Sequence, residues 1–255
     1  MSHVLVEQHD RVLSLRLNRP ERRNAMTGEM YGVLAEQLER AGQDPEVRAI
    51  CLSGEGKGFC AGNDLADFMN APSMGEGSSV LRFLHAITRC EVPLVAAVHG
   101  AAVGVGTTLL LHCDLVYAAP SARFALPFVN LGLVPEAASS LLLPRIMGHV
   151  RAAELILLGE PFSAQKALGC GLINEVVDEE QLLERALGTA HKLAAKPPAA
   201  LRRSRALLKR ATAEEVQATL ALEVEHFVDQ LGGPEASEAF TAFFEKRKPD
   251  FSRFS

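Results

Sequence analysis

The chain has 255 residues and a formal net charge of −5, with 48% hydrophobic and 22% charged residues. That length can bury the core of one large domain or of two small ones. The acidic balance argues against a general nucleic-acid-binding surface. No apolar run of the sequence approaches the ~20 residues of a membrane span, and the first residues lack the layout of a secretory signal. We therefore expect a cytoplasmic protein without nucleic-acid or membrane partners.

The five cysteines are scattered along the chain and form no Cys-x-x-Cys pair. Disulfide frameworks and zinc sites use paired or closely spaced cysteines, so dispersed ones indicate reduced, small hydrophobic side chains. We expect neither disulfides nor a bound metal.

The N-terminal part of the sequence predicts two strands, a helix and a third strand. Residues 4–7 and 12–17 are apolar runs on either side of a polar turn. Thr27 is a suitable N-cap for a helix with one apolar face, which Gly42 ends. Residues 47–52 form the next strand-length apolar run.

A glycine-punctuated loop over residues 53–65 follows and leads into a new helix. Its backbone amides are free to meet a ligand, although a plain flexible connection explains the same composition. Residues 69–79 have the composition of a mobile loop. A helix over residues 80–89 then precedes a continuous apolar strand over residues 94–98.

Three glycines, Gly100, Gly104 and Gly106, follow that strand before a helix that we expect to open at Thr107. Glycines let the backbone turn tightly and leave amide N–H groups bare at a helix start, where the helix dipole favours negative charge. The pattern lacks the Gly-Lys-Ser/Thr of a P-loop, and such turns also serve close packing in many α/β proteins. A turn that holds an anion and a turn that only packs are both consistent with these residues.

The next part of the chain predicts short strands at residues 114–118 and 123–125. Helices are expected from about Glu136 and over residues 150–158. A last strand over residues 172–177 ends the mixed α/β part of the sequence.

Beyond residue 177 the pattern is helical. Asp178 and Thr212 each begin a spacing that resembles a capping box. Pro197-Pro198 and residues 232–234 separate three helices. These helices have wide apolar faces, so they cover either their own core or a neighbouring subunit.

Glu136 is a single carboxylate in an apolar run. It either complements the dipole in the first turn of a helix or, if it is buried, has a raised pKa that suits a general base. We expect Asp64 to be a helix cap and His99 to form a structural hydrogen bond. Ser139 and Ser140 have no His/Asp pattern around them, which argues against a serine nucleophile.

Five sequence blocks, in order and over nearly the whole chain, resemble the crotonase (enoyl-CoA hydratase/isomerase) superfamily. The blocks are LNRPERRNAM (17–26), GFCAGNDL (58–65), HGAAVGVG (99–106), CDLVY (113–117) and FEKRKP (244–249). The resemblance implies an α/β fold: a spiral core of ββα turns over residues 1–195, which holds an acyl-CoA site, and an all-helical trimerisation region over residues 196–255. It also implies a homotrimer or a dimer of trimers.

The resemblance assigns roles to the two glycine-rich loops. In that family the thioester carbonyl of an acyl-CoA lies between two backbone N–H groups, and the matching positions are Asn63 and Val105. Such an oxyanion hole stabilises the charge that develops on the thioester oxygen by ~3 kcal/mol per donor. Coenzyme A is part of the substrate, so no separate cofactor is implied.

The resemblance also implies contacts to the substrate and to its CoA moiety. The matching positions are Arg22, Ala25, Ala61, Asp64, Leu65, Phe128 and Lys246. The adenine end of CoA would lie against the segment from Arg22 to Ala25, and Lys246 would reach the CoA phosphates from a neighbouring subunit.

Departures from the family pattern favour an isomerase. Hydratases of the family have two glutamates in the pocket, and this sequence has Thr108 and Phe128 at those places. Glu136 matches the catalytic glutamate of the peroxisomal-type Δ3,Δ2-enoyl-CoA isomerases, which also have an apolar residue at the position of Val105. One base suffices for an isomerase, since Glu136 would take a proton from C2 of a 3-enoyl-CoA and return it at C4.

Other reactions stay open at this point. An acidic residue at the position of Glu136 also occurs in family members that isomerise ring-derived acyl-CoAs or attack aryl-CoA as a nucleophile. The nucleophilic case is less expected, because the chain has no Trp and only Tyr31 and Tyr117, which predicts a pocket poor in aromatic side chains. Further alternatives are a hydratase-type lyase that uses Glu136 alone and a non-catalytic acyl-CoA or RNA-binding paralogue.

Overall fold

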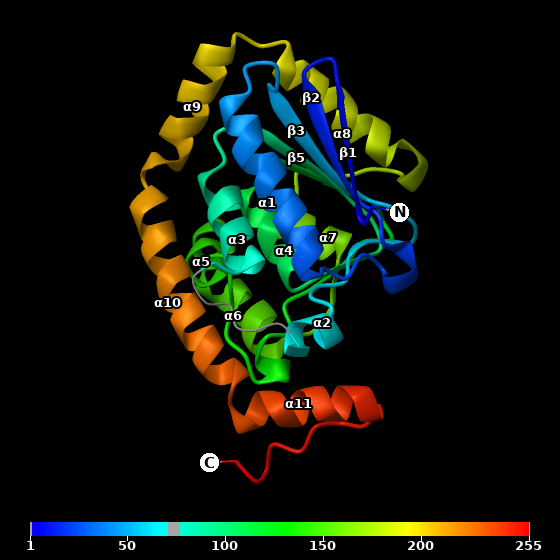
Figure 1. Ribbon diagram of the computed structural model, residues 1–255, viewed down its shortest axis with the longest axis vertical. Helices are drawn as coiled ribbons and strands as arrows, with labels where there is room; N and C mark the ends of the chain where they lie inside the picture. Colours follow the sequence, from blue (N-terminus) through cyan, green and yellow to red (C-terminus); the bar gives the residue numbers. More distant parts are fainter. Residues whose placement is uncertain (1, 71–76, 255) are drawn as a thin grey trace.

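A six-stranded sheet runs through the molecule (Figure 1). The computed structural model describes residues 2–70 and 77–254. β1 and β2 form an antiparallel hairpin, and the other neighbouring strands of this sheet pair in parallel. In sheet order the strands are β1 (Val4–His9), β2 (Val12–Leu17), β3 (Ala49–Gly54), β5 (Leu94–Val98), β7 (Leu115–Ala118) and β10 (Glu175–Val176).

A second sheet consists of four short strands. In sheet order they are β4 (Gly58–Cys60), β6 (Ala101–Val103), β8 (Arg123–Ala125) and β9 (Phe162–Ser163). Its first three strands directly follow strands of the large sheet along the chain: β4 follows β3, β6 follows β5, and β8 follows β7. Helical segments come after each pair, so the predicted ββα repeat of an α/β fold is confirmed.

Helices cover both faces of the large sheet (Figure 1). Side chains alternate between the two faces of a strand, and β3 shows this clearly. Ile50 packs into the apolar cluster that contains the buried faces of α1 (Gly28–Gln43) and α3 (Ser79–Arg89). Its neighbour Cys51 packs into the other cluster, with the alanine-rich face of α8 (Glu179–Ala194). The core therefore has two apolar layers with the sheet between them.

The last three helices lie along one side and across one end of the molecule (Figure 1). They are α9 (Pro198–Arg210), α10 (Ala213–Leu231) and α11 (Pro234–Glu245). α10 packs against α5, and α11 packs against α10 and η3. The remaining helical segments are η1 (Pro20–Arg22), α2 (Leu65–Asn70), α4 (Val105–Thr108), η2 (Leu109–His112), η3 (Val129–Leu131), α5 (Ser139–Met147), α6 (His149–Leu158) and α7 (Ala164–Gly169).

The first predicted helix is confirmed in detail. The Thr27 side chain accepts a hydrogen bond from the N–H of Met30, and α1 runs one residue past the predicted end at Gly42. The helix after the glycine turn begins at Val105 rather than at the predicted Thr107. β4 and β6 were not predicted, because residues 58–60 were interpreted as part of a glycine-punctuated loop and residues 101–103 as part of a glycine turn.

Predictions for the second half of the chain need two corrections. The helix expected from Glu136 begins at Ser139, because Ala137 and Ala138 have left-handed backbones with φ of 59° and 56°. The strand expected over residues 172–177 contains only Glu175–Val176. Glu136 therefore lies before the helix and not in its first turn, which removes the dipole explanation for it.

The predicted capping boxes are also wrong. Neither Asp178 nor Thr212 forms a side-chain cap hydrogen bond. We predicted three helices beyond residue 177, and the described residues form four. The additional helix arises because Ala211 and Thr212 separate α9 from α10. The two predicted separators, Pro197-Pro198 and residues 232–234, are confirmed as the junctions on either side.

The predicted boundary at residue 195 falls in the connection between α8 and α9. The division of the chain into a core and a trimerisation region stays a prediction. Of the mobile loop predicted over residues 69–79, residues 71–76 lie outside the described residues. Among the described residues, no helix combines the length and the apolar character needed to cross a membrane.

Asp114 joins the large sheet to the C-terminal helices. Its carboxylate accepts hydrogen bonds from the N–H of Leu94 at 2.8 Å and from Nε of Arg205 at 2.7 Å. Lys209 adds an ion pair at 3.8 Å. The Arg205 side chain is 8% exposed, so water cannot replace a lost partner of its guanidinium. This contact ties α9 to the start of β5.

We expect Asp114→Asn to lower the free energy of unfolding by about 3 kcal/mol, because it leaves a buried guanidinium without its charged partner. Urea denaturation followed by circular dichroism measures this change. Glu36→Gln is the matched control: Glu36 and Arg40 form an ion pair in which both side chains are more than half exposed. The control should change stability by less than about 0.5 kcal/mol. Equal effects of the two substitutions would contradict the proposed role of Asp114.

Candidate functional site

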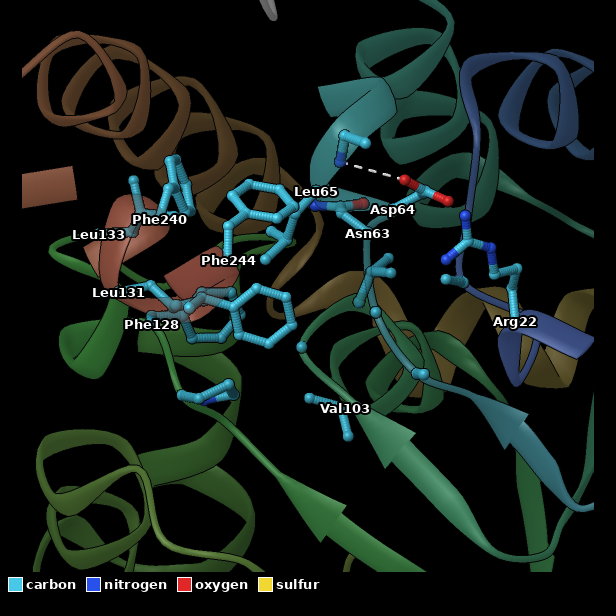
Figure 2. A pocket seen from close by; sticks show the side chains of 18 of the residues that line it. Arg22, Asn63, Asp64, Leu65, Val103, Phe128, Leu131, Leu133, Phe240 and Phe244 are labelled. Atoms are coloured by element: carbon cyan, nitrogen blue, oxygen red, sulfur yellow. Dashed lines mark hydrogen bonds between the residues drawn. The ribbon is translucent and has the colours of Figure 1, made fainter. Parts of the chain in front are cut away.

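A cavity of about 490 Å³ opens between the first glycine-rich loop, the start of α4 and the C-terminal helix α11 (Figure 2). Figure 2 shows Arg22 on one side of it and Leu131, Leu133 and Phe240 on the opposite side. Of the predicted site residues, those that line the cavity are Arg22, Ala25, Ala61, Asn63, Asp64, Leu65, Val105 and Phe128. Glu136 and Lys246 do not line it.

The first predicted oxyanion residue, Asn63, is fixed from both backbone and side chain. Met26 forms a parallel bridge with it, in which the N–H of Met26 donates to the oxygen of Gly62 at 2.8 Å and the N–H of Asp64 donates to Met26 at 2.9 Å. The Tyr31 hydroxyl donates to Oδ1 of Asn63. Within residues 2–70 and 77–254 the N–H of Asn63 donates to no other backbone group, so it is available to a ligand.

Glycines bring the second loop against the first. Gly104 has a φ of 54°, which favours glycine, and its N–H donates to Ala125 at 2.9 Å. A Cβ on Gly106 would lie 2.5 Å from the carbonyl oxygen of Cys60, so only glycine lets α4 approach β4 this closely. The N–H of Val105, the first residue of α4, has no backbone acceptor in the described part of the chain. Both amide groups that the resemblance implies therefore border one cavity.

Asp64 is a helix cap, as predicted. Its Oδ1 accepts hydrogen bonds from the N–H groups of Ala66 at 3.1 Å and Asp67 at 3.2 Å, and Figure 2 shows one such bond within the cavity wall. Its other oxygen forms an ion pair with Arg19 at 2.7 Å. Asp64 is thus occupied in holding the loop and is not a free acid or base.

The cavity is rich in phenylalanine, and the prediction of a pocket poor in aromatic side chains is wrong. That prediction rested on the absence of Trp and the two Tyr residues, whereas the chain has 12 Phe. Figure 2 shows Phe128 and Phe244 between the Asn63 loop and the Leu131 side of the cavity. The phenylalanines that line it are Phe128, Phe227, Phe240, Phe243 and Phe244.

Glu136 is a buried carboxylate with one free oxygen. Its side chain is 2% exposed, and the Thr108 hydroxyl donates to Oε1 at 3.4 Å. Oε2 has no hydrogen-bond partner among the described residues. Burial, and after it the charge of Glu223, raise the pKa of Glu136 to about 7, while the Thr108 hydrogen bond opposes the rise. A carboxyl group that titrates near neutrality is suited to accept and return a proton.

The backbone that follows Glu136 is held from two sides. Nε2 of His112 contacts the carbonyl oxygen of Ala137 at 2.8 Å. Burial lowers the pKa of His112 to about 4, so the ring is neutral at pH 7 and Nε2–H is the donor. From the other side, Glu223 accepts a hydrogen bond from the N–H of Ala138 at 2.6 Å.

Glu136 lies close to the cavity without being one of its lining residues. Val105 is in the cavity wall, and Thr108, which contacts Glu136, is at the other end of the short helix α4. Leu133 is also in the wall and precedes Glu136 by three residues. Lys246, in contrast, is not brought to this cavity within one chain: it ends α11 with a φ of 56°. Its predicted contact with CoA stays a prediction about a neighbouring subunit.

Three site residues were not singled out from the sequence: Tyr31, His112 and Glu223. A signal for Glu223 is present, because it lies three residues after Leu220 and four before Phe227, both of them buried. This spacing places a carboxylate on the apolar face of a helix, where a structural or functional reason is required. Tyr31 and His112 have no comparable pattern.

His99 and the cysteines have structural surroundings in the described part of the chain. Nε2 of His99 lies 2.9 Å from the carbonyl oxygen of Gly56, in agreement with its predicted structural role. The cysteines are free, and burial raises the pKa of the Cys60 thiol to about 12. The described residues contain no group of three or more His, Cys, Asp or Glu side chains that could hold a metal ion.

Comparison with known proteins agrees with the fold. The family description "Enoyl-CoA hydratase/isomerase" matches residues 7–253. The 1,2-epoxyphenylacetyl-CoA isomerase of Escherichia coli (strain K12) is 39% identical and is covered over 99% of both chains. The 2,3-dehydroadipyl-CoA hydratase of the same strain is 35% identical over 98% of this chain and 99% of its own.

Solved structures point the same way. The crystal structure of an enoyl-CoA hydratase/isomerase from Pseudoalteromonas atlantica T6c has a TM-score of 0.95 and 46% sequence identity. The match covers 98% of this chain and 100% of that one. The protein therefore belongs to the enoyl-CoA hydratase/isomerase family and has the crotonase fold.

Proposed function

We propose that this family member is a Δ3,Δ2-enoyl-CoA isomerase, which moves the double bond of a 3-enoyl-CoA to the 2-position. The observation that supports it is the single free oxygen of Glu136, a buried carboxyl group whose pKa is raised to about 7. Glu223 is the carboxylate whose charge raises the pKa of Glu136. Both of its oxygens already accept hydrogen bonds from Ala138 and Ser140. One carboxyl group with one free oxygen suits a reaction that takes a proton from one carbon and returns it to another.

Hydration makes a larger demand on the site. It needs a group that activates water and an acid that delivers a proton to the α-carbon. At the two positions matched to hydratase glutamates, the Thr108 hydroxyl donates to Glu136 and Phe128 has no polar side-chain atom. Of the three matched positions, Glu136 alone then has a carboxyl group to perform both tasks.

In the proposed mechanism the thioester oxygen lies between the N–H groups of Asn63 and Val105. Oε2 of Glu136 takes a proton from C2, the C2–H bond breaks, and its electron pair delocalises through the dienolate onto the thioester oxygen. The two N–H donors stabilise this charge by ~3 kcal/mol each. The same carboxyl group then protonates C4, and the double bond moves from C3–C4 to C2–C3 without any change in oxidation state.

We also propose that CoA binds along the Arg22 side of the cavity and that the enzyme is a homotrimer or a dimer of trimers. Arg22 and Ala25 line the cavity, and Figure 2 shows Arg22 on the side away from Phe240, which leaves the phenylalanine side for the acyl group. The side chains of Leu207 and Leu208 on α9 are 67% and 85% exposed, and a subunit contact would cover such apolar groups.

We expect Glu136→Gln to lower the rate of isomerisation of trans-3-hexenoyl-CoA by about 10³-fold, since the amide cannot accept the C2 proton. The absorbance of the conjugated 2-enoyl thioester measures the rate, and mass spectrometry of the product detects hydration. Glu36→Gln, a substitution in an exposed ion pair, is the control and should keep full activity. Unchanged activity of Glu136→Gln would rule out Glu136 as the base.

The pH dependence follows from the raised pKa of Glu136. Only the ionised form accepts a proton, so kcat/KM should rise with pH and level off above an apparent pKa of about 7.

The raised pKa also makes stability depend on pH. Between pH 4.5, the ordinary pKa of a glutamate, and about pH 7, Glu136 keeps its proton in the folded protein and loses it in the unfolded chain. Wild type should therefore lose stability relative to Glu136→Gln as pH rises through this window. Urea denaturation at several pH values measures the difference, and a constant difference would contradict the raised pKa.

The phenylalanine side of the cavity favours a second candidate, the isomerisation of ring-derived acyl-CoA. Flat apolar rings pack well against aromatic side chains, and five phenylalanines line this cavity. The similarity to a 1,2-epoxyphenylacetyl-CoA isomerase also supports a ring-derived acyl group as substrate. Glu136 would have the same role in both reactions, so the two candidates differ in the acyl group and not in the base.

We expect Phe244→Leu to raise KM for 1-cyclohexenylacetyl-CoA several-fold more than KM for trans-3-hexenoyl-CoA. The loss of an aromatic contact to the ring corresponds to about 1 kcal/mol. Both probes are 3-enoyl thioesters and form conjugated products, so one absorbance assay serves for both. Phe251→Leu is the matched control, because Phe251 contacts Phe254 and does not line the cavity. If Phe244→Leu changed both KM values equally, the cavity would not select for rings.

A further inference from the structure

Glu223 is a buried carboxylate in the middle of α10, far along the sequence from the proposed base. Its residue is 5% exposed, and it shares the buried face of α10 with Leu220 and Phe227. No cation is among the groups that act on it; burial raises the pKa of Glu223, and hydrogen bonds from Ser140 and Ala138 oppose that rise. A carboxylate in such a place is unfavourable unless its contacts compensate for the lost water.

The three hydrogen bonds that Glu223 accepts from the described residues come from the segment directly after Glu136. The N–H of Ala138 donates to Oε2 at 2.6 Å, and the N–H and hydroxyl of Ser140 donate to Oε1 at 2.9 Å and 2.5 Å. Both carboxylate oxygens are used. The carboxylate of Glu223 thus binds the residues between Glu136 and the first turn of α5.

That segment has an unfavourable backbone conformation. Ala137 and Ala138 are consecutive left-handed residues with φ of 59° and 56°, a conformation that is unfavourable for non-glycine residues. It persists only where the surroundings enforce it. Glu223 holds it through Ala138, and His112 holds it through the carbonyl oxygen of Ala137 at 2.8 Å.

The negative charge of Glu223 also raises the pKa of Glu136. Two described groups whose pKa is raised in turn by the charge of Glu136 are neutral at pH 7: burial raises the pKa of Tyr31 on α1 well above its ordinary value and that of Cys60 on β4 to about 12. Burial lowers the pKa of His112 on η2 to about 4. Thr108 on α4 contributes only a hydrogen bond.

We propose that Glu223 is a positioning residue for Glu136: its carboxylate holds the left-handed turn after Glu136, directs the free oxygen of Glu136, and keeps a negative charge beside it. This inference rests on the proposed function, in which Glu136 is the base. It places a determinant of proton transfer in the C-terminal helical region, on a side chain that does not itself meet the substrate.

The test compares Glu223→Gln with Glu225→Gln, which removes the same charge from an exposed position two residues away on α10. The first readout is the pKa of the Glu136 carboxyl group from ¹³C NMR of glutamate-labelled protein, with the signal assigned by its loss in Glu136→Gln. The second readout is kcat and KM for trans-3-hexenoyl-CoA against pH. Glu223→Asp, which keeps the charge but shortens the reach, separates charge from position.

We expect Glu223→Gln to lower the pKa of Glu136 by about one unit, because it removes a like charge. The acid limb of kcat should move to lower pH by the same amount, while the plateau falls about tenfold with KM little changed, since a misplaced base slows only the proton transfer. Glu223→Asp should lower the plateau without the shift in pKa. Glu225→Gln should change none of these.

The proposal is overturned if the pKa of Glu136 and the kcat profile in Glu223→Gln match those of Glu225→Gln. Should Glu223→Gln fail to fold, the absence of a lowered kcat in Glu223→Asp would overturn it equally. The NMR readout needs no turnover, so it separates this inference from the proposed function. A shifted Glu136 pKa in an enzyme that leaves every 3-enoyl-CoA unchanged would support the positioning role and reject the isomerase.

Discussion

The burial of one carboxylate with an unpartnered oxygen is the constraint on which the site depends. Glu136 loses nearly all contact with water, and one of its oxygens receives no hydrogen bond from the described residues. An ion in such surroundings is unfavourable, so the group keeps its proton to a higher pH than a free glutamate does. The same features that destabilise the folded protein give the carboxyl group the proton affinity that carbon acid chemistry at neutral pH requires.

The rest of the fold brings distant segments to this carboxylate. Gly106 allows α4 to contact the backbone of Cys60, which places the amides of the two glycine-rich loops at one cavity. Tyr31 on α1 holds the Asn63 side chain. α10 contributes Glu223 to the turn that follows Glu136. The ββα core thus provides the groups proposed to face the thioester, and the C-terminal helices support the group proposed to act as base.

Local features of the site could be predicted from the sequence. The strand over residues 94–98, the glycines at 104 and 106, and the isolated carboxylate at 136 are each visible within a few residues, because apolar runs and glycine turns are local signals. The cap at Asp64 is local as well. The prediction that the loops of Asn63 and Val105 form one site came from the family resemblance, because no rule of sequence spacing relates the two loops.

Features that depend on the tertiary structure were missed or predicted wrongly. The left-handed turn is formed by Ala137 and Ala138, which show no preference for it, so the helix start was placed too early. The partner that holds this turn lies 85 residues further along the chain. The aromatic character of the cavity was missed for the same reason, since most of its phenylalanines come from α10 and α11 and reach the cavity only through the fold.

A double-label experiment decides between one-carboxylate isomerisation and water addition. The substrate is trans-3-hexenoyl-CoA with deuterium at both C2 positions, and the solvent is water enriched in ¹⁸O. If Glu136 moves the proton, the 2-hexenoyl-CoA product has deuterium at C4 and no ¹⁸O. A trans-3-hexenoyl-CoA substrate that stays unchanged, while trans-2-hexenoyl-CoA in the same solvent gives 3-hydroxyhexanoyl-CoA that contains ¹⁸O, would contradict the proposed mechanism and indicate a hydratase.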